Sequence, residues 1–269
     1  MTGRLDIVGL GPGGPEHRTP AAAAAVSGAE VVIGYGPYVD QCADLLDGQE
    51  VVRGAMGEEA ARADQALARA AAGARVALVS SGDAGVHGMA ARTLARAAAL
   101  PDDERPAIEV VPGVTAAHAC AARIGLPVTL RERVRHFSVV TGATADGAPD
   151  LDWQALAAPD TAFAVYMGVG NAPLLRCHLL AAGADPDTPV VIVENGTRED
   201  ERAFAITLAD LSDCVAGQAI AGPAVIFVGL DWETAGLCRP ETVIVHRRQH
   251  QPAHDRDCDD VIANAEALP

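Results

Sequence analysis

Residues 4–15 read Arg-Leu-Asp-Ile-Val-Gly-Leu-Gly-Pro-Gly-Gly-Pro, an apolar run that ends in a turn of glycine and proline. Four later segments repeat this arrangement of a strand-like run followed by small residues: Ser81–Gly85, Pro112–Ala117, Tyr166–Gly168 and Glu194–Thr197. In an open α/β sheet, ligands bind at the carboxyl ends of the strands. The five turns therefore predict one ligand cleft to which most of the chain contributes.

The composition points to the same fold class. The chain has 269 residues, of which 49% are hydrophobic and only 3% aromatic, so the core must consist of Ala, Val, Leu and Ile. Buried parallel strands have this composition. A net charge of −16 disfavours a nucleic acid or an anionic membrane as partner. Every long apolar stretch is interrupted and the N-terminus has no secretory signal, so we expect a cytoplasmic protein without a transmembrane helix.

Six cysteines stand singly, and no two of them have the Cys-x-x-Cys spacing of a zinc site or a redox pair. We therefore expect reduced cysteines and no metal site. All 20 basic residues are Arg, which excludes Schiff-base catalysis and a lysine-dependent phosphate loop.

Strand and helix signals alternate through residue 124, and this βαβα pattern predicts a parallel sheet. The expected strands are Arg4–Leu10, Glu30–Gly34, Arg75–Ser80 and Ile108–Val111, and the expected helices are Pro20–Gly28, Glu58–Ala72, Gly88–Leu100 and Thr115–Ile124.

After Gly125-Leu126-Pro127 the pattern changes, and we expect a second α/β domain. We assign 1–120 and 121–236 to two α/β domains and 237–269 to a polar surface tail. A metal site from the tail residues His246, His250 and His254 is a minor alternative. The second domain has expected strands at Phe137–Thr141, Thr161–Met167, Val190–Glu194 and Ala224–Gly229, an optional strand within Ala203–Leu211, and a helix at Asn171–Ala182.

The glycines at 9, 11 and 14 fit the G-x-G-x-x-G pattern of dinucleotide-binding proteins. The context does not fit, because Pro12 and Pro15 remove two backbone donors that a pyrophosphate would use. The following helix also begins only near Pro20. A tight turn that needs positive φ explains the glycines without a nucleotide.

Taken together and in order, the five turns resemble those of the tetrapyrrole methylases, the S-adenosylmethionine-dependent C-methyltransferases of cobalamin and siroheme synthesis. The resemblance covers residues 4 to about 232. It implies two α/β domains with a cofactor cleft between them, a homodimer, and a tetrapyrrole substrate above S-adenosyl-L-methionine.

The two halves resemble different branches of this family. The N-terminal half, through residues 34–40 and 80–90, resembles the precorrin-3B C17-methyltransferases, which we favour. The C-terminal half, through residues 127–131, 140–142, 166–169 and 193–198, resembles the uroporphyrinogen-III C-methyltransferases, which are the alternative. A methylase of a non-tetrapyrrole and a non-catalytic binding protein also stay open, because a fold hosts several functions.

The resemblance assigns the site residues. Cofactor binding falls to the small turns, through Gly82, Asp83, Ala84, Thr115, Ala116, Tyr166, Met167, Asn195 and Gly196. Substrate binding falls to the first loop and two arginines: Gly11, Pro12, Gly13, Arg131 and Arg133.

Arg131, Arg133 and Arg135 would share one face if this stretch is extended, and the planar guanidinium suits the carboxylates of a tetrapyrrole. We assign Arg131 as the catalytic residue. The alternative is that the three arginines lie on a solvated edge strand. A base that accepts the proton lost from carbon could be His87, His118 or Glu194.

Overall fold

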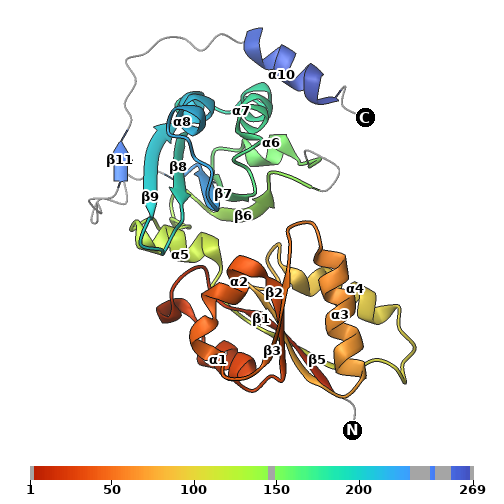
Figure 1. The fold of residues 1–269 in the computed structure, drawn as a ribbon. Coiled ribbons are helices and arrows are strands. Elements are labelled where there is room, and N and C mark those ends of the chain that lie inside the picture. The colour runs from red at the N-terminus through yellow and green to blue at the C-terminus, as the bar shows by residue number, and fades with distance from the viewer. Residues whose placement is uncertain (1–2, 145–148, 231–242, 246–255, 267–269) are drawn as a thin grey trace. The chain divides into compact units, whose positions relative to one another are not determined.

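The computed structural model describes residues 3–144, 149–230, 243–245 and 256–266 (Figure 1). The chain divides into two compact units, residues 1–119 and 120–269. Both units combine a β-sheet with helices, so the predicted α/β class is confirmed.

The first unit contains a five-stranded sheet in the order β3-β2-β4-β1-β5, in which every neighbouring pair is parallel, as predicted. Its strands are β1 (Arg4–Gly9), β2 (Val31–Tyr35), β3 (Glu50–Gly54), β4 (Arg75–Ser80) and β5 (Ala107–Val111). Its helices are α1 (Pro20–Ser27), α2 (Gly36–Gln41), α3 (Glu59–Ala71) and α4 (Met89–Ala98), with short 3₁₀ turns η1 (Pro15–His17) and η2 (Ala43–Leu45).

Helix α1 shows why these boundaries arise. The Thr19 hydroxyl accepts a hydrogen bond from the Ala22 amide at 3.1 Å, and Pro20 occupies the first turn. Both features favour a helix start, because the first amides of a helix lack partners within it. Helix α3 ends just before Gly73, whose φ of +104° suits the left-handed turn after a helix.

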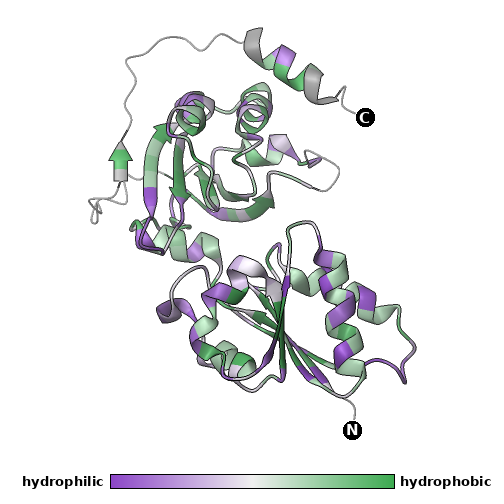
Figure 2. Ribbon diagram, viewed as in Figure 1, coloured by the Kyte–Doolittle hydropathy of each residue, from purple (hydrophilic) through white to green (hydrophobic). Residues whose placement is uncertain are grey.

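Side chains of the central strands alternate between two cores. On β4, Val76 and Leu78 pack with α3 and α4, whereas Ala77 and Val79 pack with residues of α1 and α2. A parallel sheet covered on both faces needs such continuous apolar strands. In Figure 2 the strands of this sheet are mostly hydrophobic, and hydrophilic residues lie along α3.

The second unit contains a mixed six-stranded sheet in the order β11-β9-β8-β10-β7-β6. Strands β6 and β7 are parallel, as are β9 and β11, and the other neighbouring pairs are antiparallel. The strands are β6 (His136–Thr141), β7 (Thr161–Tyr166), β8 (Pro189–Glu194), β9 (Arg202–Thr207), β10 (Ala224–Val228) and β11 (Val243–Val245). The helices are α6 (Trp153–Leu156), α7 (Ala172–Ala181), α8 (Leu211–Gly217) and α10 (Arg256–Glu266), with a 3₁₀ turn η3 (Leu208–Asp210). Helix α5 (Ala116–Arg123) contains the division between the units.

Two expectations for the second half are wrong. Residues 237–269 are not only a polar tail, because β11 pairs with β9 and α10 packs beside α7. The cysteines are not all reduced, because Cys177 of α7 and Cys258 of α10 form a disulfide across 81 residues. Single cysteines so far apart carry no spacing signal, and only the packing of the two helices brings them together. The tail histidines His246, His250 and His254 lie outside the described residues.

The arginine row also differs from its prediction. Residues 131–133 form a tight turn rather than an extended strand, since Leu130 and Val134 pair as an isolated bridge on either side of it. The Val134 amide donates back to the Leu130 carbonyl at 2.8 Å. The alternation that would place the three arginines on one face therefore does not exist.

Among the described residues, none of the helices has both the length and the apolar character needed to cross a membrane.

Candidate active site

In the first unit, three predicted turns meet at the carboxyl ends of adjacent strands. Gly9 ends β1 in register with Ser80 of β4, and Val8 pairs with Val111 at the end of β5. A Cβ on Gly9 would lie 2.7 Å from the Gly113 nitrogen and 2.8 Å from the Gly82 oxygen. Only glycine fits so close a junction.

The Asp83 side chain holds two of these turns together. One carboxylate oxygen accepts the Gly85 amide at 2.8 Å, and the other accepts the Gly113 amide at 2.9 Å. The Asp83 carboxylate thus ties the turn after β4 to the turn after β5.

Thr115 and His118 are linked at the start of α5. The Thr115 hydroxyl accepts the His118 amide at 3.2 Å and lies 2.7 Å from the ring nitrogen Nδ1 of His118. Thr115 thus caps the helix that follows the Pro112–Ala117 turn. The other candidate base of this unit, His87, has a φ of +51°, and its partial burial lowers the pKa of the imidazole.

The first glycine loop is tied down within the unit. Gly11, Pro12 and Gly13 are buried, and the Gly11 carbonyl accepts the Gly82 amide at 2.8 Å and the Gln41 Nε2 at 2.6 Å. Strand β4 separates β1 from β2, whereas the dinucleotide-binding fold places its first two strands side by side. This order supports the rejection of a dinucleotide site at the loop.

In the second unit, the residues that follow β6 and β7 are in close backbone contact. The Gly142 amide donates to the Tyr166 carbonyl at 2.6 Å, and a Cβ on Gly142 would overlap the Gly168 backbone. Met167 between them has a φ of +55° and leaves 55% of its surface exposed. An exposed methionine in a strained conformation needs a reason outside packing.

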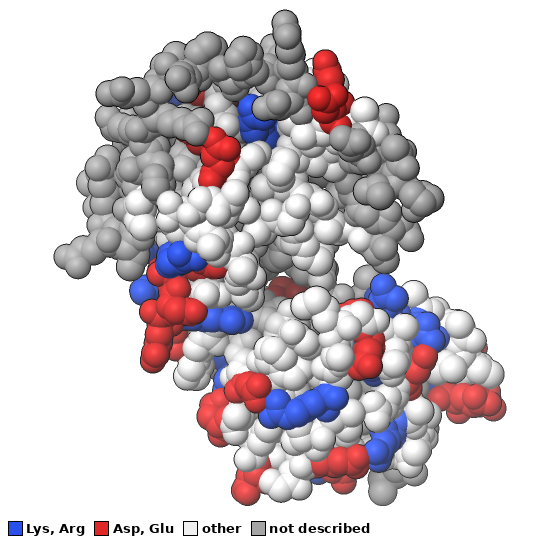
Figure 3. Space-filling model, turned by 45° about the horizontal axis from the view of Figure 1, so that its top comes forward, with Lys and Arg blue, Asp and Glu red and all other residues white. Residues whose placement is uncertain are grey.

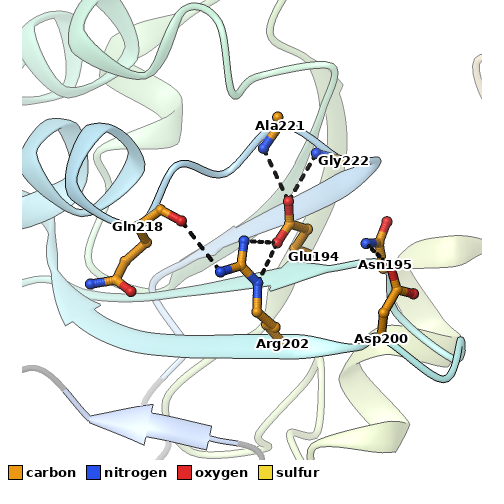
Figure 4. A network of polar contacts seen from close by, with 7 residues as sticks. All are labelled: Glu194, Asn195, Asp200, Arg202, Gln218, Ala221 and Gly222. Carbon is orange, nitrogen blue, oxygen red and sulfur yellow. Dashed lines mark hydrogen bonds and ion pairs between the residues drawn. The ribbon is translucent and has the colours of Figure 1, made fainter.

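Glu194, at the end of β8, is a buried carboxylate with a complete set of partners (Figure 4). One oxygen accepts the amides of Ala221 and Gly222 at 3.0 and 2.9 Å. The other accepts the Arg202 guanidinium, with Nε at 2.7 Å. Burial by itself would raise the pKa of Glu194, but the Gly222 amide, Arg202 and the Ala221 amide together lower it. Both carboxylate oxygens already accept hydrogen bonds, which disfavours Glu194 as a candidate base.

The turn after β8 contains two further strained residues. Asn195 has a φ of +51° and Thr197 a φ of +69°. The side-chain amide of Asn195 donates to Asp200 at 2.7 Å, also drawn in Figure 4. A β-branched residue at positive φ is a genuine outlier. Strain of this kind clusters at binding and catalytic sites.

Arg131 and Arg133 lie at the other end of this sheet. Their turn precedes β6, whereas the turns of residues 166–168 and 194–197 follow β7 and β8, and a strand of six residues spans about 20 Å. Arg133 lines a pocket of about 450 Å³ together with Leu130 and with Thr161 at the start of β7. Within the second unit, the structure therefore does not bring the arginines to the strand-end turns.

Figure 3 shows acidic and basic side chains interspersed on the visible face. Pairs such as Arg53–Asp40 at 2.7 Å and Arg18–Asp44 at 2.8 Å neutralise arginines locally. Among the described residues there is no group of three or more His, Cys, Asp or Glu that could hold a metal ion.

Sequence reasoning identified the glycine turns, including residues 140–142, but missed three residues that contact the turn after β8 or the end of that strand: Gly222, Cys120 and Glu201. Glu201 belongs to the run Arg-Glu-Asp-Glu-Arg at 198–202, which reads as a solvated loop.

Comparisons with known proteins agree with this arrangement. The sequence model of the family described as Tetrapyrrole (Corrin/Porphyrin) Methylases matches residues 4–212. A siroheme synthase from Gluconacetobacter diazotrophicus is 35% identical over 241 residues, which cover 84% of this chain and 49% of that protein. The chain spans about half the length of the curated relatives it matches.

Two solved structures are similar over most of the chain. Cobalt precorrin-4 methyltransferase, a cobalamin biosynthetic enzyme, is 26% identical with a TM-score of 0.74, covering 84% of this chain and 94% of that one. Uroporphyrin-III C-methyltransferase from Thermus thermophilus, complexed with S-adenosyl homocysteine, is 29% identical with a TM-score of 0.71, covering 84% and 92%.

The fold defines an α/β protein in which turns rich in glycine follow the carboxyl ends of the strands. The match over residues 4–212 specifies it further: the chain belongs to the tetrapyrrole methylase family, and the resemblance found in the sequence is confirmed.

Proposed function

We propose that this chain is an S-adenosyl-L-methionine-dependent C-methyltransferase that acts on a tetrapyrrole. The observation that carries the proposal is the group of strained turns at the carboxyl ends of β7 and β8, in a family with a member solved in complex with S-adenosyl homocysteine. Homodimer formation and a cytoplasmic location belong to the same proposal.

Methyl transfer from S-adenosyl-L-methionine requires few catalytic side chains. The methyl group on a sulfonium is already activated, so the protein positions donor and acceptor and excludes water. In this chain Asp83 and Thr115 bind their own backbone, so the N–H and C=O groups of the turns would recognise the cofactor. The proposed cofactor residues are those of the sequence prediction: Gly82, Asp83, Ala84, Thr115, Ala116, Tyr166, Met167, Asn195 and Gly196.

The proton lost from carbon needs an acceptor. Since Glu194 is occupied, His87 and His118 stay as candidates. The lowered pKa of His87 keeps its imidazole neutral at pH 7, as a proton acceptor must be.

Two substrates are in question. Residues 34–40 and 80–90 favour precorrin-3B, methylated at C17. The uroporphyrin-III C-methyltransferase, at 29% identity, and the siroheme synthases support uroporphyrinogen III. We now place uroporphyrinogen III first, because the siroheme synthases are 32–35% identical to this chain, whereas the cobalt precorrin-4 methyltransferase is 26% identical.

Arg131 is proposed to bind a substrate carboxylate from the turn before β6. A charge-assisted pair contributes about 1.5–3 kcal/mol, and lysine lacks the planar fork that forms it bidentately. We expect Arg131→Lys to raise the KM for the tetrapyrrole and to leave the affinity for S-adenosyl homocysteine unchanged. Arg135→Lys is the matched control, and equal KM values for both variants would remove Arg131 from the site.

The central experiment combines binding and turnover. Calorimetry with S-adenosyl homocysteine tests the cofactor, and incubation with S-adenosylmethionine and either uroporphyrinogen III or a precorrin mixture, followed by mass analysis, tests the substrate. A gain of one or two methyl groups on uroporphyrinogen III is expected. Binding without methylation of either substrate would favour a different acceptor, and no binding would favour a non-catalytic protein.

A matched pair of variants locates the cofactor. Met167 and Met56 are both exposed methionines, and each follows a strand. Only Met167 has a positive φ and belongs to the proposed cofactor residues. We expect Met167→Ala to weaken binding of S-adenosyl homocysteine and Met56→Ala to leave it unchanged.

A further inference from the structure

We infer that Glu201 and Arg123 form a positioning pair, which holds Thr197 at positive φ and so fixes the 195–197 turn in the shape that binds the cofactor. The inference rests on the proposed function for the identity of the ligand. It concerns residues that contact the turn rather than the ligand.

Glu201 is well placed for this role. Its side chain is only 4% exposed, and one carboxylate oxygen accepts the Thr197 amide at 2.6 Å. The other oxygen accepts Nε of Arg123, on the last turn of α5, at 3.2 Å. A buried carboxylate needs such hydrogen-bond donors, because burial removes it from water. The pair therefore connects the 195–197 turn to α5.

Thr197 adopts a backbone conformation that its own side chain disfavours. It is buried, its φ is +69°, and its hydroxyl has no hydrogen-bond partner among the described residues. A β-branched residue avoids this region of φ and ψ unless neighbouring groups impose it. The hydrogen bond from its amide to Glu201 is the neighbouring contact that does so.

A second contact presses the same turn against the same helix. A Cβ on Gly196 would overlap Sγ of Cys120, so the backbone lies directly on α5. Burial raises the pKa of Cys120 to about 12, and the residue therefore packs as a neutral thiol. Glu194 fixes the beginning of the turn and Glu201 its end, so that two buried carboxylates enclose the strained residues.

This arrangement predicts a specific dependence. Without Glu201, the Thr197 amide loses its acceptor, and threonine relaxes toward negative φ. Glycine at 197 would keep positive φ at no steric cost, so it should make Glu201 dispensable. A role of Glu201 in stability alone would not show this dependence on residue 197.

The test is a double-mutant cycle with four proteins: the parent, Glu201→Ala, Thr197→Gly and the double variant. Calorimetry with S-adenosyl homocysteine should give a dissociation constant at least tenfold higher for Glu201→Ala than for the parent. Adding Glu201→Ala to Thr197→Gly should change the constant less than twofold. Glu199→Ala, an exposed acid in the same loop, is the control and should stay within twofold of the parent.

Equal effects of Glu201→Ala on both backgrounds, or no effect on the parent, would overturn the inference. If Glu201→Ala does not fold, Arg123→Gln replaces it, with a smaller expected loss in the same pattern. Amide hydrogen exchange at Thr197 needs no ligand: it should accelerate in Glu201→Ala and not in Glu199→Ala. A parent that does not bind S-adenosyl homocysteine but shows this exchange pattern would contradict the proposed function and keep the positioning role, whereas unchanged exchange would reject the role by itself.

Discussion

Glu194 and Glu201 are buried acids whose carboxylates accept hydrogen bonds from backbone amides. Each accepts at least one amide and one arginine, and together they enclose a turn with two non-glycine residues at positive φ. Glu194 accepts the amides of Ala221 and Gly222, and Glu201 accepts the amide of Thr197. Their contribution at the residue scale is to shape the backbone.

Glu194 should make the stability of the protein depend on pH. Its pKa is lowered in the folded state, so its stabilising contribution is complete above the unfolded pKa and is lost as the pH falls through the folded pKa. We expect Glu194→Gln to lower the free energy of unfolding at pH 7 by about 1–3 kcal/mol. The difference from the parent should shrink below about pH 4. Urea unfolding at several pH values measures this, and a difference independent of pH would contradict it.

Gly196 should tolerate no side chain. A Cβ there would overlap Sγ of Cys120, and such overpacking costs about 1–3 kcal/mol. Gly196→Ala should therefore destabilise the second unit, and Cys120→Ala in the same chain should restore most of the loss by removing the sulfur. Gly170→Ala is the control, since a Cβ at Gly170 meets nothing within 4 Å. Thermal unfolding compares these three variants with the parent; failure of Cys120→Ala to rescue would show that another contact is limiting.

At the scale of elements, the disulfide between Cys177 and Cys258 should fasten α10 to α7. It closes a loop over 81 residues, and a crosslink of this kind contributes about 2–4 kcal/mol by restricting the unfolded chain. Cys258→Ser should lower the free energy of unfolding by that amount, and reduction should do the same to the parent but nothing to the variant. Cys214→Ser, at a free cysteine of α8, is the control. A parent indifferent to reductant would show that the bond does not form in solution.

Elements with a strong local signal were predictable from sequence. Helix α1 has its cap and proline, α3 its final glycine, and β4 a continuous apolar run. Strand β3 was missed because its residues are mostly exposed and it owes its conformation to pairing with β2 at the sheet edge. Helix α10 was missed because the stretch is polar and it packs only through a partner far along the chain.

The parts of the site that have a local sequence signal were also predictable. Glycines such as Gly82 indicate a close approach of two backbone segments. The order of the turns along the chain indicated that they belong to one site. The extended arginine row failed because alternating charges resemble a strand even where the backbone turns, as it does between Leu130 and Val134. The role of Glu201 could not be predicted from sequence, because only tertiary packing decides which acid of a charged loop becomes buried.

At the scale of the whole molecule, the question is whether turns of both units respond to one ligand. If the proposed cofactor residues are correct, saturating S-adenosyl homocysteine should slow amide exchange at residues 82–84 and 115–116 as well as at 166–168 and 195–197. Ligand at one hundred times its dissociation constant should also stabilise the folded protein by about 2.7 kcal/mol. Protection confined to the turns of one unit would reject the shared assignment. NADH at the same concentration is the control and should protect neither set, because the first glycine loop is buried and β4 separates β1 from β2. Protection by NADH of residues 9–15 would instead make the first loop a nucleotide site.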